Sequence, residues 1–246
     1  MTTHDYDAYY LTPLVKGAHN NPDDGLCLLE LTAMFAREQH SDHPKCVSPV
    51  LGAFGRNLND VLPDDLRQEL KGLIPSLPGT ANDGMDERRG YMALDWLIRT
   101  WLPTWLDLVP ACREDARKIR ELGRIVDLVS AERAGPVVRA GKVNAAAAGD
   151  VAWAAARAAA WAAAGDAAWD AARDAARAAA RDAARAAAWD AARAAAWAAA
   201  WAAAGAAARD AARDALKPTV TRLQESAIEL YAEMIKGGAT TTESEA

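Results

Sequence analysis

Two cysteines and two histidines are the residues whose types could form a metal site. Three of these potential ligands lie close together in the segment HSDHPKC, and a cysteine precedes them in the segment GLCLLEL. Imidazole nitrogen and thiolate sulfur are donors that suit tetrahedral zinc. The candidate zinc ligands are therefore Cys27, His40, His43 and Cys46. Their spacing fits no established zinc motif, so zinc is a possible cofactor and not a required one.

A structural role is the alternative for the same residues. Cys27 recurs with Leu31 and Met34 at helical spacing, which predicts that its thiol fills a core position as a small apolar group. The histidines would then lie on a turn whose backbone donors are bound by neighbouring polar side chains.

Catalytic chemistry has weaker support. Several residues could gather as general acids and bases, although acidic residues are common at helix starts: Asp23, Asp24, Glu30, Asp42 and His43. The sequence contains no nucleophile elbow, no P-loop and no HExxH motif. The basic pair Arg88-Arg89 is predicted to be a solvated surface. These observations lean against an enzyme and assign no catalytic residue.

A tandem repeat of four residues occupies the chain from Gly149 to Lys217. Its first position is mostly Trp, Arg or Gly, its second is usually Asp or Ala, and the other two are nearly always Ala. Alanine has the highest helix propensity, so this tract is expected to form a long helical arm, as one rod or folded back. Because four residues exceed one helical turn, the first position spirals around the axis instead of forming one face.

The repeat offers two modes of interaction. Alanine faces every side of such a helix, so neighbouring helices can approach closely. A position that accepts an indole, a guanidinium or a hydrogen is loosely constrained, which favours packing or spacing over a defined ligand contact. A recognition surface of aromatic side chains is the alternative, and its candidates are Trp153, Trp161, Trp169, Trp189, Trp197 and Trp201.

The segments on both sides of the repeat have the apolar spacing of amphipathic helices. Pro103, Gly135-Pro136 and Pro218 are expected to end or separate helices. The sequence thus predicts an all-α fold. Helices are expected over 25–39, 48–60, from 63, and over 86–101, 112–133 and 219–236. The predicted parts are a helical head domain at 1–134, the arm at 135–217, a C-terminal amphipathic helix at 218–236 and a disordered tail at 237–246.

Composition limits the partners and the compartment. The 246 residues carry 28 Lys and Arg against 34 Asp and Glu, a net charge of −6 that lacks the basic footprint of a nucleic-acid-binding protein. Three scattered cysteines favour a reducing compartment. The start has no basic segment followed by an apolar one, and no run of 18 strongly apolar residues occurs. We therefore expect a cytoplasmic protein without membrane association.

Three segments resemble a family of uncharacterised proteins from actinobacteria with GC-rich genomes and from their phages. These segments are DDGLCLLEL followed by HSDHPKCVSPVLGAFGRNLND, then DERRGYMALDWLIRTWLP, and finally PTVTRLQESAIELYAEMI. With the repeats between them, the resemblance covers most of the chain. The family has no established activity, so the resemblance implies provenance and architecture but no catalytic residues.

Three hypotheses for function follow from the sequence. The first is a non-enzymatic structural or interaction protein whose arm packs against itself or against another helical protein. The second is a zinc-binding or enzymatic head for which the arm is a spacer. The third is a nucleic-acid-associated regulator of a phage or its host, which the charge balance disfavours.

Overall fold

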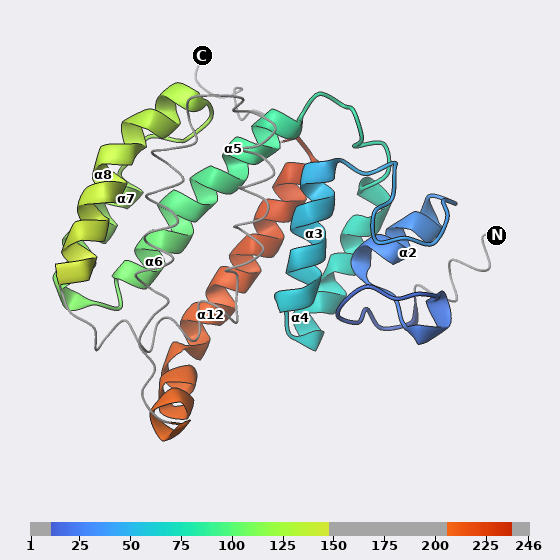
Figure 1. Cartoon of the computed structure of the whole chain (residues 1–246), viewed down its shortest axis with the longest axis horizontal. Coiled ribbons are helices and arrows are strands. Elements are labelled where there is room, and N and C mark those ends of the chain that lie inside the picture. Colours follow the sequence, from blue (N-terminus) through green and yellow to red (C-terminus); the bar gives the residue numbers. More distant parts are fainter. Residues whose placement is uncertain (1–10, 148–205, 238–246) are drawn as a thin grey trace, which may run out of the picture.

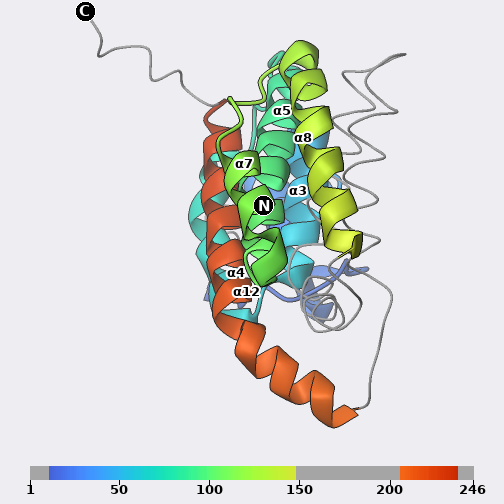
Figure 2. The ribbon, with the colours of Figure 1, turned by 90° about the vertical axis from the view of Figure 1, so that its left-hand side faces the viewer.

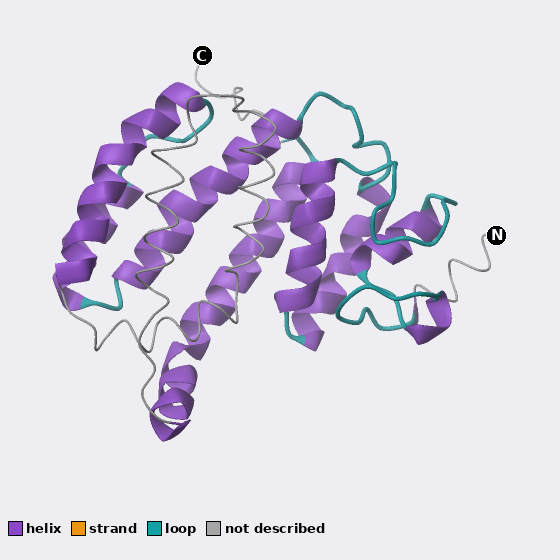
Figure 3. Cartoon of the chain, in the orientation of Figure 1, coloured by secondary structure: helices purple, strands orange, loops and turns teal. Residues whose placement is uncertain are grey.

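The computed structural model describes residues 11–147 and 206–237, which form an all-α fold (Figures 1 and 3). Within these two ranges no strand occurs, so the predicted fold class is confirmed. The elements in chain order are η1 (Pro22–Asp24), α2 (Leu28–Phe35), α3 (Pro49–Val61), α4 (Asp64–Glu69), η2 (Leu70–Ser76), α5 (Asp86–Trp96), η3 (Leu97–Trp101), α6 (Leu102–Leu106), η4 (Pro110–Cys112), α7 (Arg113–Arg120), α8 (Leu128–Ala147) and α12 (Ala206–Ile235).

Local sequence signals set several helix starts. The hydroxyl of Ser48 accepts a hydrogen bond from the backbone N–H of Leu51 at 3.3 Å, and Pro49 follows in the first turn of α3, near the predicted helix start at 48. Asp64 and Asp65 lie in the first turn of α4, where negative charge stabilises the helix N-terminus. These short-range rules hold because each signal acts within one turn.

Helix α12 lies in the middle of the bundle and packs against α3, α5 and η2 (Figure 1). The phenol ring of Tyr231 stacks on Phe54 of α3 with 5.6 Å between the ring centroids. Ile228 of this helix is partly buried, and its larger apolar side chains are buried: Leu223, Leu230, Tyr231, Met234 and Ile235. Helix α12 is thus packed into the bundle through its apolar side chains.

The structure contradicts the helix breaks predicted at three prolines. Pro103 lies in the first turn of α6, which continues from η3 without a break, whereas Pro136 lies inside α8 and Pro218 inside α12. A proline inside a helix costs about 3 kcal/mol because it removes one backbone donor and crowds the preceding turn. Burial of apolar side chains on either side of each proline offsets this cost.

The π turn η3 explains how the chain accommodates Pro103. The backbone N–H of Leu102 donates to the carbonyl of Leu97, five residues back, which widens the turn ahead of the proline ring. The hydroxyl of Thr104 donates to the carbonyl of Thr100 at 2.6 Å. Trp101 and Trp105 on either side of Pro103 are buried and meet edge to face, as expected of core tryptophans.

The single helix predicted over 112–133 is wrong, because the structure divides it between α7 and the start of α8. Asp127 and Ser130 supply the start signal of α8. The carboxylate of Asp127 accepts a hydrogen bond from the backbone N–H of Ser130 at 2.7 Å and so caps α8. The hydrogen bonds from Ser130 also lower the pKa of Asp127.

Helix α8 ends just before the alanine-rich tract, α12 begins within the last quartets of that tract, and both helices reach the same end of the bundle (Figure 1). Helix α8 runs toward that end and α12 runs away from it (Figures 1 and 2). The first turns of α12 extend beyond the rest of the bundle (Figure 2). Of the helices described, none is both long and apolar enough to cross a bilayer.

Candidate functional site

The first predicted zinc ligand, Cys27, lies at the N-terminal cap of α2 and is 2% exposed. Burial raises the pKa of its thiol to about 12, so the thiol stays protonated at neutral pH. Zinc binds the thiolate form of cysteine. The position of Cys27 therefore agrees with the structural alternative, in which its side chain fills the core.

Glu30, three residues after Cys27, is the polar centre of this region and is 1% exposed. Its Oε2 accepts a hydrogen bond from the backbone N–H of Cys27 at 2.7 Å, which is the second half of a capping box. Its Oε1 accepts the backbone N–H of His19 at 2.5 Å, and its Oε2 lies 2.8 Å from Nδ1 of the same histidine. These contacts compensate the buried carboxylate and hold the preceding loop against α2.

Of the two predicted histidine ligands, His40 lies near this carboxylate and His43 lies on an exposed turn. Nε2 of His40 lies 2.9 Å from the carbonyl oxygen of His19 and 3.8 Å from Oε1 of Glu30. His43 is exposed, and its Nδ1 lies 2.7 Å from Oδ1 of Asp42.

Cys46 is held by backbone contacts. Its carbonyl accepts the backbone N–H groups of Gly79 and Ala81. Burial, with the nearby carboxylate of Glu38, raises the pKa of the Cys46 thiol to about 11. Across residues 11–147 and 206–237, no group of three or more His, Cys, Asp or Glu side chains is arranged to hold a metal ion.

Arg89 of α5 forms a second buried polar centre and is 1% exposed, so the predicted solvated position is wrong. Its two terminal nitrogens donate to the two carboxylate oxygens of Asp83 at 2.8 and 2.6 Å, and these hydrogen bonds lower the pKa of Asp83. Its Nε donates to the carbonyl of Met234 at 3.0 Å. Arg89 therefore binds the C-terminal end of α12 to α5, where positive charge complements the helix dipole.

The Arg89 centre extends to the start of α3. The hydroxyl of Ser48 donates to Oδ1 of Asp86 at 2.5 Å, and the same carboxylate oxygen lies 3.4 Å from Nη1 of Arg89. The backbone N–H of Ser48 donates to the hydroxyl of Thr80 at 3.0 Å. A single network of hydrogen bonds thus joins α3, α5 and the end of α12.

Small side chains fix the position of α8. Five of its buried residues recur at alternating intervals of three and four and form one stripe, which we call the α8 seam: Ala131, Ala134, Val138, Gly141 and Ala145. A Cβ atom at Gly141 would lie 3.2 Å from Cδ1 of Ile119 on α7, tighter than ordinary contact. The side-chain amide of Asn144 donates to both carboxylate oxygens of Asp115 at 3.0 Å. Helix α8 thus lies close against α7 because its seam carries almost no side-chain bulk.

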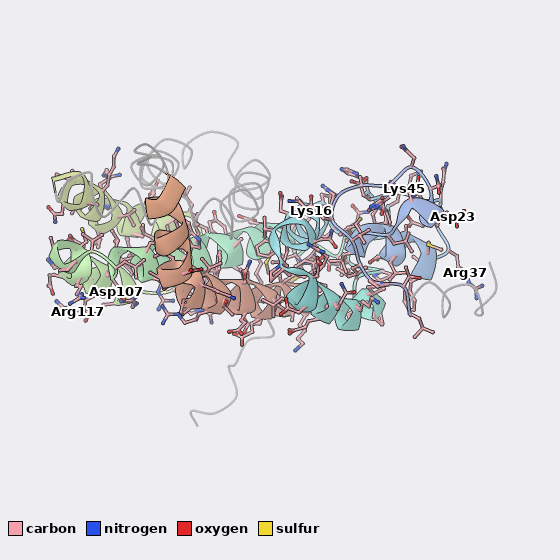
Figure 4. All side chains as sticks on the ribbon, turned by 90° about the horizontal axis from the view of Figure 1, so that it is seen from below. Lys16, Asp23, Arg37, Lys45, Asp107 and Arg117 are labelled. Atoms are coloured by element: carbon pink, nitrogen blue, oxygen red, sulfur yellow. The ribbon has the colours of Figure 1, made fainter. Side chains whose placement is uncertain are left out.

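The charged side chains labelled in Figure 4 lie along the longest dimension of the described bundle, which runs across the helices α8 and α12. Asp107 and Arg117 lie at the end formed by α6, α7 and α8. Arg117 forms exposed ion pairs with Glu114 and Glu121 along α7, at 2.6 and 2.5 Å. Such exposed pairs contribute little to stability. Toward the opposite end lie side chains of both signs, Asp23, Arg37 and Lys45, and Lys16 lies nearer the middle.

The candidate aromatic surface of the arm lies outside the described residues. This applies to Trp153, Trp161, Trp169, Trp189, Trp197 and Trp201. Comparison with models of known families, with curated proteins and with solved structures finds no match for this chain. The resemblance to actinobacterial and phage proteins therefore stays a prediction, and the function has to be argued from the chain itself.

Proposed function

We propose that the chain is a non-enzymatic structural protein whose alanine-rich tract packs side by side with the tract of a second copy. The helical bundle anchors both ends of the tract. The α8 seam carries this proposal, because α8 leads directly into the tract and already packs on a neighbouring helix through Ala and Gly. The tract has the same small side chains at most of its positions.

The placement of the tract ends supports the same proposal. Since α8 runs toward one end of the bundle and α12 leaves from that end, the tract departs and returns on the same side (Figure 1). A segment with this geometry can reach a partner without displacing the helices that hold it.

The buried polar groups of the bundle support a structural role. The carboxylate of Glu30 binds backbone and side-chain groups of the loop before α2, and Arg89 binds the end of α12. Burial raises the pKa of the Tyr231 hydroxyl, which donates to the carbonyl of Leu51 at 3.1 Å. These groups use their hydrogen bonds to hold helices and loops together, which is a stabilising function.

Sedimentation equilibrium of the full chain tests the proposal. The full chain is expected to associate, and a variant whose residues 148–205 are replaced by Gly-Ser sequence of equal length is expected to associate at least tenfold more weakly. Equal length keeps the connection between α8 and α12 and removes only the alanine-rich surface. A monomeric full chain, or equal association of both proteins, would contradict the proposal.

A second variant separates the two modes of contact in the tract. Changing all six tryptophans of the tract to alanine removes the indoles and leaves the alanine surface in place. Association is expected to persist in this variant, because small side chains carry the proposed contact. Its loss would assign the contact to the tryptophans instead.

A further inference from the structure

Helix α8 carries a second apolar stripe on the side opposite its seam. Val129, Pro136 and Val143 are spaced by seven residues and are exposed, with Val129 and Val143 at 52% and 65%. At about 100° per residue, these three positions lie roughly 180° around the helix from the seam. We call them the outer stripe. Helix α8 is therefore apolar on two opposite sides, and its seam is the side that packs on α7.

The outer stripe concentrates the exposed apolar side chains of the described part of the molecule. The large ones are Leu11, Leu108, Val126, Val129 and Val143, of which two lie on α8 and one just before it. An apolar stripe with a spacing of seven residues is typical of a helix that packs against another helix.

The charges beside the outer stripe are self-complementary. Glu132 and Arg139 are exposed and lie on the same flank, about 40° and 60° from Pro136 around the helix axis. In an antiparallel pair, the two-fold axis runs between the two helices and perpendicular to both. It keeps this flank on the same side of the dimer and reverses the order of its residues along the helix. It therefore places Glu132 of each copy opposite Arg139 of the other. Antiparallel helix dipoles favour the same arrangement.

We propose that the outer stripe of α8 binds the same stripe of a second copy in antiparallel orientation. Val129 of each copy then packs near Val143 of the other, and two Glu132–Arg139 ion pairs border the contact. The inference goes beyond the function proposed above, because it assigns an interface to the bundle itself. One helix pair forms a small interface, so we expect a dissociation constant in the micromolar range.

Charge reversal in the full chain tests the interface. Glu132→Arg and Arg139→Glu are each expected to weaken dimerisation at least fivefold in sedimentation equilibrium, and the double variant is expected to restore it. Val143→Lys is expected to weaken dimerisation at least tenfold. Leu11→Lys removes an exposed apolar side chain from the N-terminal part of the bundle, and it is expected to leave dimerisation unchanged. Circular dichroism confirms that each variant remains folded.

Disulfide trapping tests the orientation in a Cys46→Ser background, where the two remaining cysteines are buried. A mixture of Val129→Cys and Val143→Cys proteins is expected to form mixed disulfide dimers, because the antiparallel contact brings these positions together. Exclusive pairing of Val143→Cys with itself would overturn the antiparallel arrangement. If Val143→Lys dimerises as strongly as the wild-type chain, the proposed interface is overturned. The same holds if the double charge variant does not regain dimerisation.

The Gly-Ser variant of the tract distinguishes this interface from the proposed function. If that variant associates like the full chain while Val143→Lys does not, the α8 interface stands and the tract function fails. If the Gly-Ser variant loses association while Val143→Lys keeps it, the reverse holds.

Discussion

Helices α8 and α12 border the same tract but are anchored in opposite ways. Helix α8 rests on α7 through small side chains, and Gly141 leaves no room for a Cβ atom beside Ile119. Helix α12 buries large side chains such as Leu223 and Tyr231, and Arg89 binds its end. Full burial of a large apolar side chain stabilises a fold by about 1.5–3 kcal/mol, and a methyl group contributes much less. We therefore infer that α12 is the strong anchor and α8 the weak one.

This difference shows that close packing and strong packing are separate properties. Gly141 permits a short distance between α7 and α8 because it has no side chain, and for the same reason it buries little apolar surface. Tyr231 needs more space, which α3 provides at Gly55, and its ring fills that space. Each prediction below tests one side of this contrast.

The largest effect is expected for the polar anchor of α12. Arg89→Ala removes the buried partner of Asp83 and of the carbonyl of Met234 and is expected to lower the free energy of unfolding by about 3 kcal/mol. Urea denaturation measures this change. Arg117→Ala removes an exposed arginine with two ion pairs and serves as the control, with almost no expected effect. Equal losses in both variants would show that burial does not distinguish the two arginines.

A smaller loss is expected where α3 admits the ring of Tyr231. A Cβ atom at Gly55 would clash with the hydroxyl of Tyr231 and crowd Leu29, so Gly55→Ala is expected to lower stability by about 1–3 kcal/mol. Gly52→Ala on the same helix meets the flexible end of Arg56 at 3.4 Å and is expected to be neutral or slightly stabilising. The thermal midpoints of the two variants give the comparison.

The weak anchor is tested at the α8 seam. Gly141→Leu forces α8 away from Ile119 and is expected to lower global stability by only about 1 kcal/mol, because little apolar surface is lost. Hydrogen exchange is expected to accelerate in α8 while that of α12 is unchanged. Ala140→Leu, on the exposed side of the same helix, is the control. Faster exchange in α12 would mean that the two helices unfold as one unit.

The smallest effect concerns acid. Hydrogen bonds from Arg89 hold the pKa of Asp83 below its ordinary value, so ionised Asp83 contributes stability above the unfolded pKa of about 3.9. That contribution is lost as the pH falls through the lower folded pKa. Asp83→Asn is therefore expected to reduce the dependence of stability on pH between 7 and 3. An unchanged pH dependence in urea denaturation would remove Asp83 from the anchor of α12.

Short-range features of this fold could be predicted from the sequence, and long-range ones could not. Ser48-Pro49 marks the start of α3 because a cap acts within one turn. Pro136 does not end α8, because side chains on both sides of it, such as Ala134 and Val138, are buried and offset its cost, and the local pattern does not contain that tertiary packing.

The candidate site shows the same limit. The segment HSDHPKC groups His40, His43 and Cys46 along the chain, but the fold directs only His40 toward Glu30. His19 joins that carboxylate from a loop eleven residues away, and the glutamate three positions after a helix cap was the available signal. Arg89 is buried because α12 arrives from 145 residues away, a contact that no local rule predicts.

The shared end at which the chain leaves and re-enters the bundle has a consequence for how the protein can change with time. A connection that leaves and re-enters at the same end tolerates added or deleted quartets, since neither supporting helix needs to move when the stretch between them lengthens or shortens. Slippage during replication of a twelve-nucleotide repeat alters such a gene by whole quartets and keeps the reading frame. Variants that differ in reach could therefore arise from one ancestor while the bundle remains the same.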